Sequence, residues 1–259
     1  MIASRHRRRW PWVLVIVLVL LAAMVWWFPA RWAWQFVRGD YPAVRVGDIE
    51  GSVWHGQADH VRVAGQSLGT LQWTLGRSAL LGDLHGDVDL RGAGVMANGH
   101  IARDGNGAIV IDDAHFKVPM ERLKVLWPNG ADLLGQLRGD VDRARLVDGW
   151  PVQLRAHVRW HDAGMVTHGR TVMLGQWLSR WRASGNAAIT ARLHDDGNGP
   201  LRLRGRLTVT PLGWRIRADL VPRHAGIALR RWLRDIGKPM ADGSVRIERH
   251  GGLMTGTAW

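Results

Sequence analysis

The sequence predicts a mainly β protein: an elongated, twisted antiparallel sheet with one or two short helices, preceded by a single N-terminal transmembrane helix. From Val44 onward apolar and polar residues mostly alternate, as in residues 71–75 and 201–209, which is typical of half-buried antiparallel strands. The 32 glycines interrupt these runs at short intervals, as turns and bulges do. One uninterrupted apolar run lies close to the N-terminus.

This apolar run, residues 11–28, is predicted to be a transmembrane anchor. It contains no charged residue, and at a rise of about 1.5 Å per residue a helix of this length just spans a hydrocarbon core of about 30 Å. Indole rings favour membrane interfaces, so the flanking tryptophans are expected to form a belt at each boundary. These tryptophans are Trp10, Trp12, Trp26 and Trp27.

The basic residues around the run predict its orientation. Four arginines precede it, namely Arg5, Arg7, Arg8 and Arg9, whereas fewer basic residues follow closely. The positive-inside rule therefore places the N-terminus in the cytoplasm and the body on the other side of the membrane. A cleaved signal peptide is the alternative. An uncleaved anchor is favoured because the run exceeds the usual apolar region of about 7–15 residues and no A-x-A site follows.

The domain organisation follows from the anchor. The predicted segments are a cytoplasmic tail (1–10), the anchor (11–28), a membrane-proximal linker (29–43) and a periplasmic β-rich domain (44–259). The pattern G-x-L-x-G-D-V-D occurs at residues 82–89 and again at 135–142. This echo favours two related halves, about 44–130 and 131–259, with a chance match as the alternative.

Local signals predict individual turns and helices. Residues 104–107 and 195–199 are rich in Asp, Asn and Gly, which tolerate positive φ, and are expected to be hairpin turns. Residues 119–127 are expected to form a short helix, and residues 172–181 a second one. Residues 223–236 are expected to form an amphipathic helix that ends before Gly and Pro.

The formal net charge of +13 comes almost entirely from arginine. Many arginines alternate with apolar residues, as Arg202, Arg204 and Arg206 do, which indicates a solvated strand face. A nucleic-acid surface is the alternative, but no zinc-finger spacing or RNP-like aromatic motif supports it. No nucleic-acid partner is therefore expected.

The sequence contains no recognisable catalytic motif. There is no cysteine, no G-x-S-x-G, no phosphate-binding loop and no H-E-x-x-H. We therefore expect no catalytic residues, no metal, no cofactor and no small-molecule substrate. Asp87/Asp89 and Asp140/Asp142 are D-x-D pairs, which in a strand present two carboxylates on one side and suit a divalent ion. A solvated strand face is the preferred interpretation of both pairs.

Residues 51–56, Gly-Ser-Val-Trp-His-Gly, place two glycines around an indole. We expect a bulge or tight bend in which Trp54 is a buried packing residue. With a short tail and one anchor before it, this element (Gly51, Trp54 and Gly56) resembles the type II secretion system protein N family, also called general secretion pathway protein N. Further short Gly- and Trp-based motifs follow in the family's order, at 61–65, 68–73, 199–205, 211–214 and 236–239.

The resemblance implies a non-catalytic accessory component of the type II secretion system in the inner membrane of Gram-negative bacteria. It implies a role in protein secretion across the outer membrane through protein–protein contacts. The expected partners are other secretion subunits in the inner membrane and periplasm, together with the phospholipid bilayer.

The alternative function is that of a membrane-anchored periplasmic lipid-binding or lipid-transfer β-groove protein. A contiguous exposed apolar face would favour this alternative, whereas a closed core with only polar surface would favour a scaffold.

Overall fold

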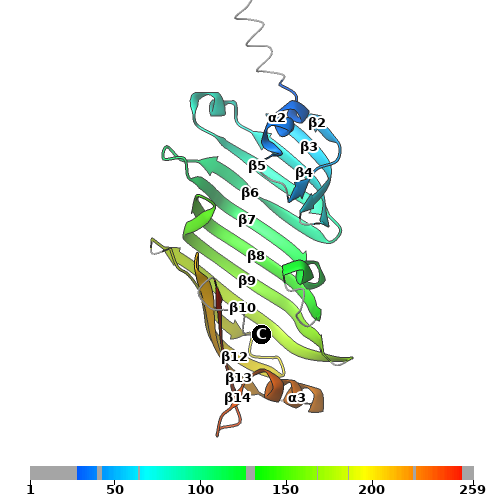
Figure 1. Ribbon diagram of the computed structural model, residues 1–259, viewed down its shortest axis with the longest axis vertical. Coiled ribbons are helices and arrows are strands. Elements are labelled where there is room, and N and C mark those ends of the chain that lie inside the picture. Colours follow the sequence, from blue (N-terminus) through cyan, green and yellow to red (C-terminus); the bar gives the residue numbers. More distant parts are fainter. Residues whose placement is uncertain are drawn as a thin grey trace, which may run out of the picture.

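The computed structural model describes residues 28–39, 43–63, 65–126, 132–167, 169–185, 187–223 and 226–252. In the described residues one 15-stranded sheet extends from end to end, and consecutive strands from β3 to β13 pair with each other in an antiparallel meander (Figure 1). The mainly β, antiparallel architecture predicted from the alternating pattern is confirmed. The sheet is elongated and twisted, with the N-terminal strands at one end and the C-terminal strands at the other.

The strands lengthen toward the middle of the sheet. The first seven are β1 (Val44–Arg45), β2 (Ile49–Gly51), β3 (His55–Val63), β4 (Gln66–Leu75), β5 (His85–Gly92), β6 (Val95–Arg103) and β7 (Ile109–Pro119). The remaining ones are β8 (Asp132–Val147), β9 (Trp150–Thr167), β10 (Arg170–Ser184), β11 (Ile189–Asp195), β12 (Leu201–Thr210), β13 (Gly213–Pro222), β14 (Lys238–Pro239) and β15 (Val245–Gly252). Both β1 and β2 pair with β3, and β15 lies between β13 and β14.

The densely buried core lies at the C-terminal end of the sheet. Helix α3 (Ile227–Ile236) buries Leu229, Trp232 and Leu233, which pack with residues of β9, β10, β12, β13 and β15. The three largest fully buried side chains, Leu174, Leu201 and Leu220, belong to this cluster. The amphipathic helix predicted within residues 223–236 is thus confirmed, and its apolar stripe faces the sheet as the pattern requires.

Of the other two predicted helices, one is a strand and one is a 3₁₀ helix. The helix expected at residues 172–181 is wrong, because this segment lies inside strand β10. The register of β10 shifts on both sides of Gly175, and these bulges break the alternation that marks a strand. Pairing with β9 and β11 decided its conformation. The short helix expected at 119–127 is a 3₁₀ helix, η3 (Met120–Leu126), and a second one, η2 (Arg77–Leu81), was not predicted.

Both predicted hairpin turns are confirmed, and an aspartate organises each of them. Asp104 Oδ1 accepts hydrogen bonds from the backbone N–H groups of Asn106 and Ala108, at 2.9 and 3.0 Å. Asp195 Oδ1 accepts from the N–H of Leu203 at 2.9 Å, and its Oδ2 pairs with Arg223 at 2.7 Å. Burial raises the pKa of Asp195, but these hydrogen bonds outweigh burial and leave the pKa below its usual value.

The N-terminal part of the described chain contains helix α2 (Ala30–Val37), within the segment expected to be a linker. Its Trp32 and Phe36 are 52% and 78% exposed. Apart from Phe28, the predicted anchor lies outside the described residues, as do the four arginines and four tryptophans expected to flank it. Among the residues that the structure describes, no helix is long and apolar enough to cross a bilayer.

Candidate functional site

One row of polar residues crosses the entire sheet. The strand register places one residue from each of β2 to β13 and β15 directly opposite its neighbours, and residues paired in this way share a face. We call this set the polar row. Its members are Glu50, Gln57, Gln72, Asp89, Asn98, His115, Asp140, His157, Arg180, Arg192, Arg206, Arg217 and Glu248.

A second row lies on the opposite face, because each of its members is the chain neighbour of a polar-row residue. We call it the apolar row. It comprises Ile49, Ala58, Leu71, Leu90, Ala97, Phe116, Gly139, Val158, Ser179, Leu193, Gly205, Ala218 and Ile247. Ser179 is its one polar member. Along these two rows the sheet therefore places polar and apolar residues on opposite faces.

The apolar row is covered unevenly. Helix α3 contacts β10 and β15 at the C-terminal end, and α2 contacts β2 at the N-terminal end. In between, large side chains of the row such as Leu71, Leu90 and Phe116 are only half-buried. The paired apolar residues thus continue along the middle of the sheet with half-buried large side chains, whereas the lipid-binding alternative asked for an exposed apolar face.

The apolar row passes a pocket of about 360 Å³ beside α3. Apolar side chains line it, including Trp160, Trp177, Leu193 and Trp232. The rings of Trp160 and Trp177 meet edge to face, with centroids 5.2 Å apart. Their indole N–H groups donate to backbone carbonyls 2.9 and 3.3 Å away. Because those polar groups are satisfied, the rings offer only apolar surface to the pocket.

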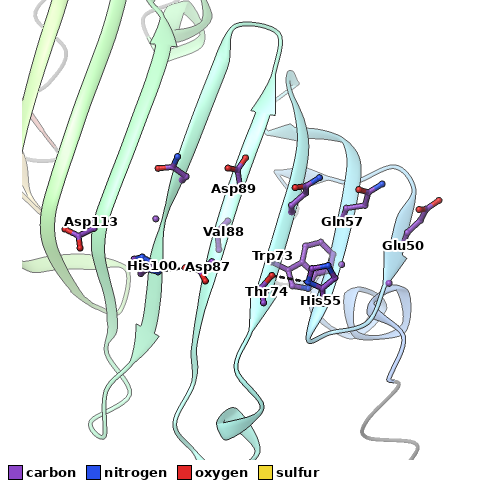
Figure 2. A pocket seen from close by; sticks show the side chains of 15 residues that line it. Glu50, His55, Gln57, Trp73, Thr74, Asp87, Val88, Asp89, His100 and Asp113 are labelled. Atoms are coloured by element: carbon purple, nitrogen blue, oxygen red, sulfur yellow. Dashed lines mark hydrogen bonds and ion pairs between the residues drawn. The ribbon is translucent and has the colours of Figure 1, made fainter.

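On the polar face, a hollow of about 580 Å³ lies over β2–β7. Figure 2 shows that Glu50, Thr74, Asp87 and His100 line it, projecting from neighbouring strands. His55 Nδ1 lies 3.1 Å from Thr74 Oγ1, within hydrogen-bonding distance. Polar and apolar residues line it together, and its ionisable groups come from several strands of the same face.

Three of the four D-x-D carboxylates lie against a histidine or an arginine. Asp87 pairs with His100, and Asp89 accepts from Arg91 Nε at 2.7 Å. The bond with Asp89 raises the pKa of the Arg91 guanidinium. Asp140 lies 3.7 Å from His115. Within the described ranges, no three His, Cys, Asp or Glu residues gather closely enough to bind a metal ion. These pairings favour the solvated strand face over a divalent-ion site.

The Gly-x-x-Trp-x-Gly element forms the tight hairpin between β2 and β3. Gly51 has a φ of +85°, and a Cβ there would lie 2.5 Å from the carbonyl oxygen of His55. A Cβ on Gly56 would lie 2.6 Å from Cζ2 of Trp73, whose ring lies beside it. Both positions therefore require glycine. Trp54 was expected to be a buried packing residue, but it is only half-buried.

This hairpin also holds the start of the described chain. The N–H of Val53 donates to the carbonyl of Phe28 at 3.0 Å, and Pro29 forms a β-bridge with Ser52. Trp73 Nε1 donates to the carbonyl of Val53 at 3.1 Å. The element thus ties the last residue of the predicted anchor to the first long strands of the sheet.

Sequence reasoning identified this hairpin but missed both rows. Alternation within each strand was a visible signal, and it correctly indicated two faces of different polarity. The rows themselves depend on which residue of one strand faces which residue of the next. That register is a long-range property, and short windows of sequence do not contain it.

Together, the fold and the two rows define an open single-sheet β protein that presents two long surfaces of opposite chemistry. The chain belongs to the type II secretion system protein N family, whose model matches residues 42–248. It is 32% identical over 136 residues to type II secretion system protein N of Vibrio cholerae serotype O1, covering 51% of this chain and 54% of that relative. It is 28% identical over 137 residues to the protein of the same name from Aeromonas hydrophila, with the same coverage.

The matched region thus spans about half the length of these curated relatives. No solved structure matches the chain with significance.

Proposed function

We propose that this protein is a non-catalytic, membrane-anchored subunit that acts in type II secretion through protein contacts. The family match over residues 42–248 is the observation that carries the proposal. In this proposal the protein crosses the inner membrane once, its N-terminus is cytoplasmic and its sheet is periplasmic. Its partners are other secretion subunits.

The N-terminal end of the body supports the proposed anchor. Phe28, the last residue of the apolar run, is held by the β2–β3 hairpin. Helix α2 follows at once and leaves Trp32 and Phe36 exposed, as a helix lying at a membrane interface requires. In this proposal the anchor joins the body through Phe28, at this end of the sheet.

The pairing of the D-x-D carboxylates supports a non-catalytic role. Asp87, Asp89 and Asp140 each lie against a histidine or arginine on the solvated polar face. An acid–base catalyst needs a carboxyl held toward a reacting group in a site that excludes water. These carboxylates instead lie at the surface beside a histidine or an arginine.

Deleting the gene is expected to reduce secretion of type II substrates into the medium, and the full chain supplied in trans is expected to restore it.

A phosphatase fused to the C-terminus, which is active only after export, is expected to be active in the same cells. Replacing Arg5, Arg7, Arg8 and Arg9 with Glu removes the orientation signal and should lower that activity strongly. A phosphatase that is inactive in the unchanged protein would contradict the proposed topology.

A second candidate function is the binding of lipid acyl chains along the apolar row. The favouring observation is the row of half-buried apolar side chains that joins the pocket beside α3 to strands near the proposed anchor. An acyl chain lying on these apolar side chains would remove them from water, and this burial requires no polar partner.

Neighbouring residues on opposite faces provide a test of this candidate. A benzophenone amino acid at Phe116, in the apolar row, is expected to crosslink to phospholipid when intact cells are irradiated. The same amino acid at His115, in the polar row, is expected to give no lipid adduct, because its side chain projects from the other face. Mass spectrometry of the purified protein detects a lipid adduct at either position. Equal lipid labelling at the two positions, or none at Phe116, would contradict the candidate.

A further inference from the structure

The arginines of the polar row gather at one end of it. Arg180, Arg192, Arg206 and Arg217 occupy four successive strands, β10 to β13, and each is directly opposite the next. All four side chains are exposed. Adjacent strands lie about 4.8 Å apart, so the four guanidinium groups form a closely spaced ladder. We call these four residues the arginine row.

This ladder opposes the stability of the sheet. Like charges directly opposite each other on antiparallel strands are destabilising. Beside the row, Arg155 and Arg182 on β9 and β10 are also directly opposite each other, which adds to the repulsion. The fold therefore carries a local excess of positive charge that no packing requirement explains.

Within the part of the chain that the structure describes, Arg180, Arg192 and Arg206 form no ion pair with a carboxylate. The last member differs, because Arg217 Nη2 donates to Glu248 Oε1 at 2.6 Å. That bond lowers the pKa of Glu248. The terminal pair shows that a carboxylate fits the row and that the three preceding arginines lack one.

General arginine richness does not explain the arrangement, because the polar row changes character along the sheet. Its first members, Glu50, Gln57, Gln72 and Asp89, are acidic or neutral. A solvated strand face with average composition would mix both signs. Segregation of charge produces a field that attracts an oppositely charged partner.

We propose that the arginine row is a docking surface for an acidic segment of a partner protein. Guanidinium groups bind carboxylates bidentately, and Glu248 already provides such a carboxylate at one end. The inference does not depend on the secretion role. It names the chemistry of a partner, which the family match leaves open.

A protein segment suits the row better than a bilayer or a nucleic acid. Neighbouring strands rotate by about 20°, so four strands turn through about 60° and a flat bilayer meets only part of the row. The row also lies on the face opposite the apolar row, so it does not hold the head groups of lipids bound there. Single-stranded nucleic acids need aromatic stacking platforms, and the polar row has no aromatic side chain other than histidine. Acidic side chains on a strand or helix recur every 5–7 Å, about the spacing of the ladder.

The test uses the full chain in detergent and a fluorescent decaglutamate peptide, with binding followed by anisotropy. Replacing Arg192 and Arg206 with Gln is expected to weaken peptide binding at least about ten-fold, because ten-fold corresponds to a single charge-assisted contact and two guanidinium groups are removed. The matched control replaces Arg45 and Arg62 with Gln. These are also exposed and directly opposite each other, on β1 and β3, so the same charge is removed elsewhere. Binding by the control is expected to stay within about two-fold of the unchanged protein.

The melting temperature provides a second, ligand-free measurement. Removing two directly opposed charges relieves repulsion, so the Arg192→Gln/Arg206→Gln protein is expected to melt about 1–3 °C higher. A lower melting temperature would show that the chain itself uses these charges and would overturn the proposal. So would equal loss of peptide binding in both double variants. Binding through the row to phosphatidylglycerol vesicles or to an oligothymidine, but not to the peptide, would also overturn it.

Discussion

Replacing Leu201 with Ala is expected to lower the free energy of unfolding by about 3–4 kcal/mol. Leu201 is 0% exposed and lies in the cluster that α3 completes on the sheet. The substitution removes buried methyl groups and leaves a cavity that the surrounding strands cannot close, because β11 and β13 hold β12 on both sides. Thermal unfolding followed by circular dichroism is expected to show a melting temperature about 6–15 °C lower.

The matched control is Leu212→Ala in the turn between β12 and β13. Leu212 is 65% exposed, so the same atoms are removed without a cavity. Its effect is expected to stay within about 0.5 kcal/mol. Equal losses in the two variants would mean that the cluster beneath α3 is not what stabilises this end of the sheet. Large, fully buried side chains of the described chain are concentrated in the cluster beneath α3.

Replacing Gly51 with Ala is expected to disrupt the β2–β3 hairpin, with a cost of about 2–5 kcal/mol. A positive φ costs a residue with a Cβ about 1–2 kcal/mol. The added Cβ would also lie 2.5 Å from the carbonyl oxygen of His55, and relieving such a contact costs about 1–3 kcal/mol. Hydrogen exchange is expected to accelerate at the amides of Val53 and Leu75, which bond to Phe28 and Trp54.

Gly65→Ala separates the two contributions. Gly65 has a φ of +82°, close to that of Gly51, but a Cβ there would meet no atom within 4 Å. Its cost is expected to be the conformational part alone, about 1–2 kcal/mol. Exchange at Val53 and Leu75 should remain slow in this control. If Gly51→Ala behaves like Gly65→Ala, the close approach at the hairpin has no energetic role, and the requirement for glycine is only one of φ.

Local signals were sufficient for elements that local chemistry stabilises. The Asp104 and Asp195 turns form through hydrogen bonds within a few residues, so their composition predicted them. The α3 helix was predictable from its apolar stripe and the Gly-Pro stop after it. Residues 172–181 were mispredicted because bulges around Gly175 disturb the period of two, and pairing with both neighbouring strands outweighs the local pattern.

The amino-acid sequence by itself determined the class of fold, the polarity of alternate positions and the Gly-Trp-Gly hairpin, because these depend on steric preferences and burial of nearby residues. Only the tertiary structure decided the two rows and the contacts between them and α2 or α3. A shift of one residue in any strand would exchange its polar and apolar sides. The register also shifts at bulges, such as those between Asn98 and His100 and between Val141 and Arg143. Whether Arg192 faces another arginine or a carboxylate is therefore set by pairing across the whole sheet.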